Sequence, residues 1–384
     1  MEKIRNLLSP GLTEPLDSLN VGRHRKGSRS CDSWLTALDP KNPVYNFLIE
    51  YYGLKGQKGT RRMARWAPKP QLLLQTADRI TEIDQLTTTP ILQSVEPEEV
   101  QFDGILLEGA SGDDLGGTLH LKGAIPHADG IVYNPSLYFS QVQDPEKAAT
   151  PFIWYRNVVR QTLKAEPVLY CHGMHEWAMQ YWPEGAPPPP SAKYQQHLPL
   201  RVSREVVNAA VERRGISCTH VDALRYFAPA AGPLNHHGHI LERQKQLELE
   251  QPACVHAQMD LLKMALKLDP YCDPLLLQDI LEIALAARTL DVAASPYDAT
   301  AYGVDPIPVE TAEGRAEYRQ RQSALMVRTE PTRRALLRAY DLVLRIGFGE
   351  HVKDAPTAER YAKAEPGGLP WRKNLLTDSV VHVI

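Results

Sequence analysis

Apolar residues recur at helical spacing through most of the second half of the chain. In residues 253–268, Val255, Met259, Leu262 and Leu266 are three or four positions apart, which places them on one face of a helix. Similar patterns predict further helices over residues 145–164, 168–182, 204–214 and 273–291, and a long helix over residues 314–346 that is interrupted at Pro331. The pattern therefore predicts a mainly α fold, a multi-helix bundle.

Residues suited to helix ends flank several of these segments. Asp144 and Ser203 are good N-caps, and Gly215 is a good stop for the helix that begins after Ser203. Pro167 is suited to the first turn of the helix over residues 168–182, where its missing N–H is not needed.

Short apolar runs bounded by glycine occur only before residue 144, at residues 104–108, 117–121 and 130–133. They predict a small N-terminal β element. We expect residues 31–347 to form a single globular domain, preceded by a disordered extension because the first 30 residues lack apolar periodicity. We expect this domain to consist of a mixed α/β part (31–143) and a helical part (144–347), followed by an irregular tail (348–384).

Composition is typical of a soluble globular protein. Of the 384 residues, 43% are hydrophobic and 23% are charged, and the formal net charge of −3 gives no overall attraction to nucleic acid. No run approaches the roughly 20 apolar residues needed to span a membrane, so no membrane association is expected. Five cysteines without a secretory signal predict a reducing, intracellular and cytoplasmic location. The oligomeric state is not predicted.

Three stretches join histidine to a carboxylate inside apolar surroundings. The candidate metal ligands are His172, His175, His220 and His256, and the candidate catalytic carboxylates, as ligands or orienting groups, are Glu176, Asp222 and Asp260. Spacings of three and four residues place side chains on one helical face, as for His172 with His175 and Glu176, and for His256 with Asp260. His220-x-Asp222 with the distant His256 resembles the facial triad of non-haem iron oxygenases.

Two other interpretations of these stretches remain open. A buried histidine bonded to a carboxylate can simply join helices, and the same groups can perform acid–base chemistry without a metal. Beside the stretches, the candidate substrate-binding residues are Trp177, Arg225, Asn235 and Glu250.

Five segments together resemble a group of bacterial proteins labelled "3-methyladenine DNA glycosylase". The resemblance covers roughly residues 150–325 and 46–52. It implies base excision on DNA, which needs a basic groove, a pocket for a flipped base and an acidic residue that activates water. The sequence lacks the Gly-rich hairpin of helix-hairpin-helix glycosylases, so the resemblance assigns no catalytic residue. The segments are HEWAM (175–179), CTHVDALRYF (218–227), PAAGPLN (229–235), EQPACVHAQMDL (250–261) and ASPYD (294–298).

These observations predict a soluble metal-dependent enzyme, such as a non-haem iron oxygenase or a hydrolase, acting on a small molecule between helices. The expected cofactor is a divalent metal: iron, manganese or zinc. The alternatives are a DNA glycosylase, with nucleic acid as partner, and a non-catalytic helical protein.

Overall fold

A computed structural model describes the backbone of most of the chain after residue 143 and of short segments before it. The described residues are 41–50, 52, 105–108, 124–127, 130–133, 144–187, 189, 198–239, 242–268, 272 and 274–348. Most of them are helical, so the prediction of a mainly α fold is confirmed. The predicted N-terminal extension over residues 1–30 and the irregular tail after Phe348 lie outside the described residues.

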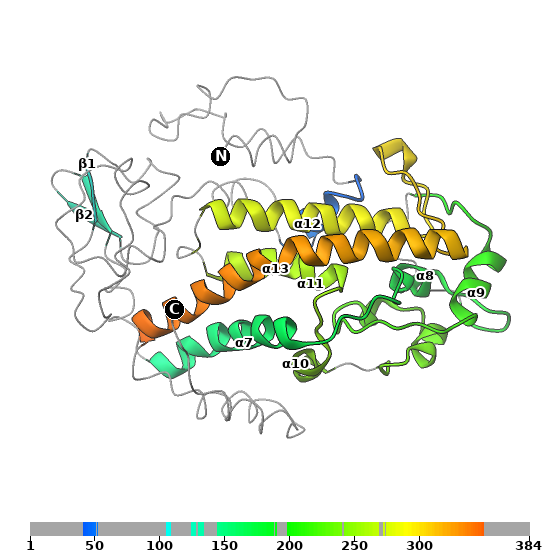
Figure 1. The fold of residues 1–384 in the computed structure, drawn as a ribbon, viewed down its shortest axis with the longest axis horizontal. Coiled ribbons are helices and arrows are strands. Elements are labelled where there is room, and N and C mark those ends of the chain that lie inside the picture. Colours follow the sequence, from blue (N-terminus) through cyan, green and yellow to red (C-terminus); the bar gives the residue numbers. More distant parts are fainter. Residues whose placement is uncertain are drawn as a thin grey trace.

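Four long helices pack side by side and enclose most of the core (Figure 1). In the figure, α13 runs in the opposite direction from α7 and α12, with α11 lying beside α12 and α13. Their bounds are Pro145–Lys164 (α7), Val255–Lys267 (α11), Pro274–Ala294 (α12) and Ala312–Phe348 (α13).

The sequence explains why α7 begins and ends where it does. The Asp144 side chain accepts a hydrogen bond from the Lys147 N–H at 2.9 Å, and Pro145 occupies a position whose N–H would have no partner. The chain becomes extended at Ala165, shortly before Pro167. The predicted bounds of this helix are therefore confirmed.

Helix α13 continues through Pro331, so the predicted interruption is wrong. Packing of α13 on α7, α11 and α12 outweighs the local cost of the proline. Two polar contacts also fix it to α11: Arg333 Nη2 donates to Gln258 Oε1 at 2.6 Å, and the Tyr340 hydroxyl donates to the Met264 carbonyl at 2.8 Å.

The predicted helix over residues 168–182 is shorter than expected. Helix α8 begins only at Met174, because His172 (φ 48°) and Gly173 (φ 68°) adopt left-handed conformations that end the extended segment before it. His172 and His175 consequently do not share one helical face. A Cβ atom on Gly173 would lie 3.0 Å from Cβ of Ala294, so this close approach of α8 to the end of α12 requires glycine.

Shorter helices complete the helical part. Helix α9 follows Ser203 as predicted but ends at Glu212, and Gly215 beyond it has a φ of 68°. With their bounds, the short α-helices are α3 (Asn46–Glu50), α8 (Met174–Gln180), α9 (Arg204–Glu212) and α10 (Gln246–Leu249). The 3-10 helices are η5 (Leu224–Tyr226), η6 (Pro229–Leu234), η7 (Arg243–Lys245) and η8 (Thr300–Tyr302).

Three short strands form an antiparallel sheet in the order β1-β3-β2. They are β1 (Ile105–Glu108), β2 (Ala124–His127) and β3 (Gly130–Tyr133). Tyr133 of β3 is aligned with Ile105 on one side and with Ala124 on the other. That this small β element belongs to the same globular domain stays a prediction. The apolar run expected to form a strand at residues 117–121 lies outside the described residues. Among the helices that the structure describes, none has the length and apolar character required to cross a membrane.

Candidate metal centre

The three predicted histidine stretches meet where α8, α11 and the turn at residues 218–222 come together. The His256 ring lies between two other imidazoles, 4.4 Å from the ring centre of His175 and 4.8 Å from that of His220. The predicted meeting of these stretches is confirmed. Among the described residues, this arrangement forms two groups that could hold a metal ion. The first consists of His175, His256 and Asp291, and the second of His220, Asp222 and Asp260.

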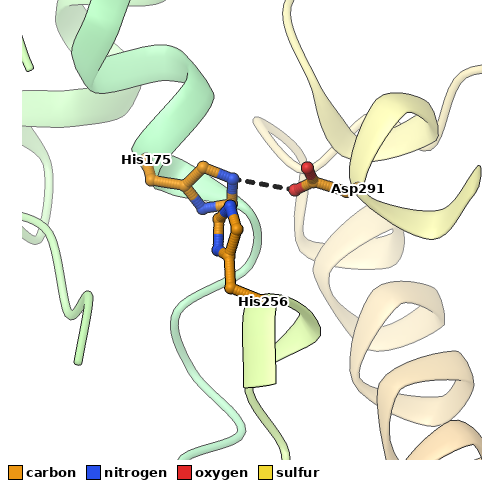
Figure 2. A group of neighbouring side chains, drawn as sticks. All are labelled: His175, His256 and Asp291. Carbon is orange, nitrogen blue, oxygen red and sulfur yellow. Dashed lines mark ion pairs between the residues drawn. The ribbon is translucent and has the colours of Figure 1, made fainter. Parts of the chain in front are cut away.

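The first group combines two imidazoles with one carboxylate from three helices. Figure 2 shows His175 of α8 and Asp291 of α12 facing each other, with the His256 ring beside them at the beginning of α11. One potential ligand atom from each residue lies within 4.8 Å of the others. Two histidines and a carboxylate are the donor set of non-haem iron(II) enzymes, and three protein ligands leave coordination positions open.

Helix α8 is held so that His175 points to α12. The buried Trp177, two residues further on, donates its indole N–H to the Ala294 carbonyl at the end of α12, at 2.8 Å. This bond and the close approach at Gly173 fix the position of α8, so the orientation of His175 follows from local packing.

The carboxylate of Asp291 is fully buried and is kept charged by its neighbours. Arg288, one turn earlier on α12, donates to Oδ2 of Asp291 at 2.6 Å and to Oε1 of Glu176 at 3.1 Å. Burial opposes ionisation, but His175 and Arg288 together hold the pKa of Asp291 below its usual range. A charged carboxylate oxygen is therefore present beside the imidazoles at neutral pH.

His175 and Asp291 form a short ion pair whose direction departs from that of an ideal hydrogen bond. Nε2 of His175 and Oδ1 of Asp291 form an ion pair at 2.8 Å, and neither atom makes a well-directed hydrogen bond in the described part of the chain. Two donor atoms bound to one ion at about 2.1 Å and at right angles would be about 3.0 Å apart. The observed separation is close to that value.

The three imidazoles have different affinities for protons. Burial, and then the charges of His175 and His220, lower the pKa of His256 well below its ordinary value, so this ring is neutral. Burial alone would lower the pKa of His175, but the charges of Asp291 and Glu176 raise it. His256 is also partly exposed, whereas His175 and His220 are buried. His256 is thus the imidazole of the group that needs no deprotonation before it binds a metal.

The second group is less suited to a cation. Nε2 of His220 lies 3.4 Å from Oδ2 of Asp260, which makes a histidine–carboxylate pair that the sequence did not predict. Asp222 already has cationic partners, Arg243 at 2.7 Å, Arg225 at 3.1 Å and Lys263 at 3.7 Å. These charges neutralise the carboxylate that a metal would need.

His172 is not brought into either group. Its Nε2 atom lies 3.4 Å from Nη1 of Arg319, and its ring packs against Tyr318. Burial, and then the charges of Arg319, Arg315 and Arg214, lower the pKa of His172 to about 4. This cationic environment opposes metal binding, and His172 lies outside both groups of potential ligands in the described residues.

The predicted substrate-binding residues mostly have structural contacts. Trp177 is in the core, and Arg225 is an exposed partner of Asp222. The buried Asn235 side chain bonds to both the N–H and the carbonyl of Cys218, at 2.9 and 3.1 Å, so it fixes the loop that carries His220. Glu250 is different: it is buried, burial raises its pKa, and its Oε1 atom has no hydrogen-bond partner among the described residues.

Sequence reasoning missed Asp291 and Arg288. Both lie in the apolar helix α12, and their spacing of three residues was the available signal. A charged pair at helical spacing inside an apolar helix must find partners, because an isolated buried charge is costly.

Comparisons with known proteins do not extend this assignment, because no family model, no curated protein and no solved structure matches the chain.

Proposed function

We propose that this protein is a non-haem iron(II) enzyme that acts as an oxidoreductase on a small molecule. His175, His256 and Asp291 would hold the metal, in the region where α8, α11 and α12 meet. The bound iron would supply the capacity to activate dioxygen at its open positions.

One observation carries this proposal: potential ligand atoms of His175, His256 and Asp291, from three different helices, lie within 4.8 Å of one another. A purely structural pair would gain a charge-assisted hydrogen bond by a small rotation of the imidazole ring. A buried ion pair with poor hydrogen-bond direction is costly, and a cation bound by both atoms would offset that cost.

The remaining residues of the site would orient the ligands and handle protons. Arg288 fixes Asp291 through Oδ2 and leaves Oδ1 available, as a supporting group does in metal sites generally. Glu250, with its raised pKa and unpartnered Oε1, is suited to hold a proton and donate it near His220 and Asp260.

Replacement of Asp291 by Asn tests the proposal. The purified protein would be loaded anaerobically with iron(II), manganese(II) or zinc(II), passed over a desalting column and analysed for metal. We expect about one iron per chain in the wild type and a loss of most of it in Asp291→Asn, because an amide oxygen is a weak ligand. Asp222→Asn is the matched control, since it removes a carboxylate from the neighbouring group, and it should keep its iron.

Two results would contradict this assignment. One is a wild type that retains none of the three metals, and the other is a loss of metal in Asp222→Asn but not in Asp291→Asn. Preferential retention of zinc, with no oxygen uptake by the iron-loaded protein, would instead favour a hydrolase at the same site.

A non-catalytic role is supported by one specific observation, the neutralised second group. Three cations around Asp222 are what a polar network that joins helices would contain. We assign this role to the second group alone. The DNA glycosylase alternative, which rests on the sequence resemblance, stays a prediction.

A further inference from the structure

The end of α9 approaches the beginning of α13 (Figure 1), and four arginines lie in the two segments that meet there. They are Arg213 and Arg214, directly after α9, and Arg315 and Arg319, which are four residues apart and so share one face of α13. The Nη1 atoms of Arg213 and Arg315 lie 3.3 and 3.1 Å from the same oxygen, the Glu310 carbonyl. The guanidinium groups of Arg213 and Arg315 thus meet at one point. Arg319 follows Arg315 by one turn of α13.

Glu310 and Glu317 do not neutralise this arginine cluster, because other arginines pair with them. Glu310 is bound through both of its oxygens by Arg201, at 2.7 and 2.8 Å, and Glu317 is paired with Arg321 at 2.5 Å. Across the described residues, no ion pair joins any of the four clustered arginines to a carboxylate. The cluster is a local excess of positive charge on a chain whose formal net charge is −3.

The histidine beside the cluster lacks a partner of opposite charge as well. Nη1 of Arg319 lies 3.4 Å from Nε2 of His172, which is a cationic donor directed at a neutral ring. The guanidinium groups of Arg214 and Arg319 are exposed and make no hydrogen bond to the backbone in the described part of the chain. Both remain able to bind a ligand from solvent.

We propose that Arg213, Arg214, Arg315 and Arg319 form a binding site for a phosphate group, either as inorganic phosphate or as a small phosphate monoester. The planar guanidinium fork matches the oxygens of phosphate, and a dianion offsets the repulsion between several like charges better than a monoanion does. The site goes beyond the proposed iron chemistry and does not depend on it.

A small ligand fits this arrangement better than a nucleic acid does. The four residues lie at one junction of two helices, where Arg213 and Arg315 reach the same carbonyl oxygen, whereas a phosphodiester backbone would require a stripe of charge along the surface. The negative net charge also opposes the approach of a polyanion.

Calorimetric titration with inorganic phosphate tests the site, at constant ionic strength maintained with chloride. We expect saturable binding at one site per chain, weakened about tenfold in Arg214→Gln and in Arg319→Gln, because each loses a charged hydrogen bond. The matched control is Arg321→Gln, which removes the same charge from the same helix at an exposed position paired with Glu317. It should bind phosphate within about twofold of the wild type.

Thermal melting of each variant would verify that it is folded. Titration with glucose 6-phosphate and with a short DNA duplex would then identify which kind of phosphate-bearing ligand the site binds. Binding of inorganic phosphate or of the monoester supports the site. The proposal is overturned by the absence of saturable phosphate binding, by equal weakening in Arg321→Gln, or by binding of the duplex alone. None of these outcomes depends on the metal content, so failure here and failure of the iron assignment are separate.

Discussion

Replacing His256 with alanine separates a metal centre from a structural network more sharply than any other single change. The His256 side chain makes no hydrogen bond to a described residue, and its structural contribution consists mainly of two ring contacts, with His175 at 4.4 Å and with His220 at 4.8 Å. At about 0.5–1.5 kcal/mol for each contact, the variant should lose about 1–3 kcal/mol of stability and remain folded. That loss corresponds to a fall in melting temperature of about 2–12 °C.

The effect on metal binding should be much larger. Structural zinc sites with four ligands bind with about 10–16 kcal/mol, so one ligand contributes about a quarter, or roughly 2.5–4 kcal/mol. Loss of the His256 imidazole should therefore weaken metal binding by a factor of about 100 to 1,000. Iron(II) affinity would be measured by competition with a chelator of known strength, and stability by thermal melting in the absence of metal.

His220→Ala supplies the contrasting variant. Its ring also stacks on His256, but Nε2 pairs with Asp260 at 3.4 Å, so its loss leaves a buried carboxylate with fewer partners. We expect greater destabilisation than in His256→Ala and a nearly unchanged metal affinity. The reasoning is refuted if metal affinity falls in His220→Ala and is preserved in His256→Ala.

Two further predictions follow from the site and its supports. The pKa of His175 is raised above its ordinary value of 6.5, and an imidazole must be neutral to bind a metal, so protons should compete with the metal as the pH falls toward and below that pKa. Iron(II) affinity should then fall about tenfold for each pH unit below the pKa. An affinity that stays constant from pH 8.5 to pH 6 would exclude His175 as a ligand. Asn235→Ala should lower the free energy of unfolding by about 3 kcal/mol, since each of its three hydrogen bonds to Cys218 and Gly238 contributes about 1 kcal/mol. Urea denaturation measures this loss. A loss below about 1 kcal/mol would show that Asn235 does not hold the loop.

The sequence by itself determined the helices whose ends carry local signals. Asp144 with Pro145 marks the beginning of α7, and the apolar spacing in residues 253–268 locates α11 to within two residues. These features depend on nearby backbone groups and on one helical face, so they can be inferred from a short window of sequence.

The sequence also selected most of the chemistry of the site. His175 and His256 were identified because histidine within an apolar segment must be satisfied by some partner. Spacing along a helix, however, suggested that His172 would join His175 and that His256 would pair with Asp260. Both inferences assumed that neighbours in sequence share a partner.

Only the tertiary structure decided which residues meet. Left-handed conformations at His172 and Gly173 direct His172 to Arg319 and His175 to Asp291, a residue of α12 more than 100 positions further along the chain. The packing of α8 against the end of α12 determines that pairing, and no periodicity within either segment contains it. A buried site made from several helices depends on how their faces pack, and local spacing restricts only the residues that each face presents.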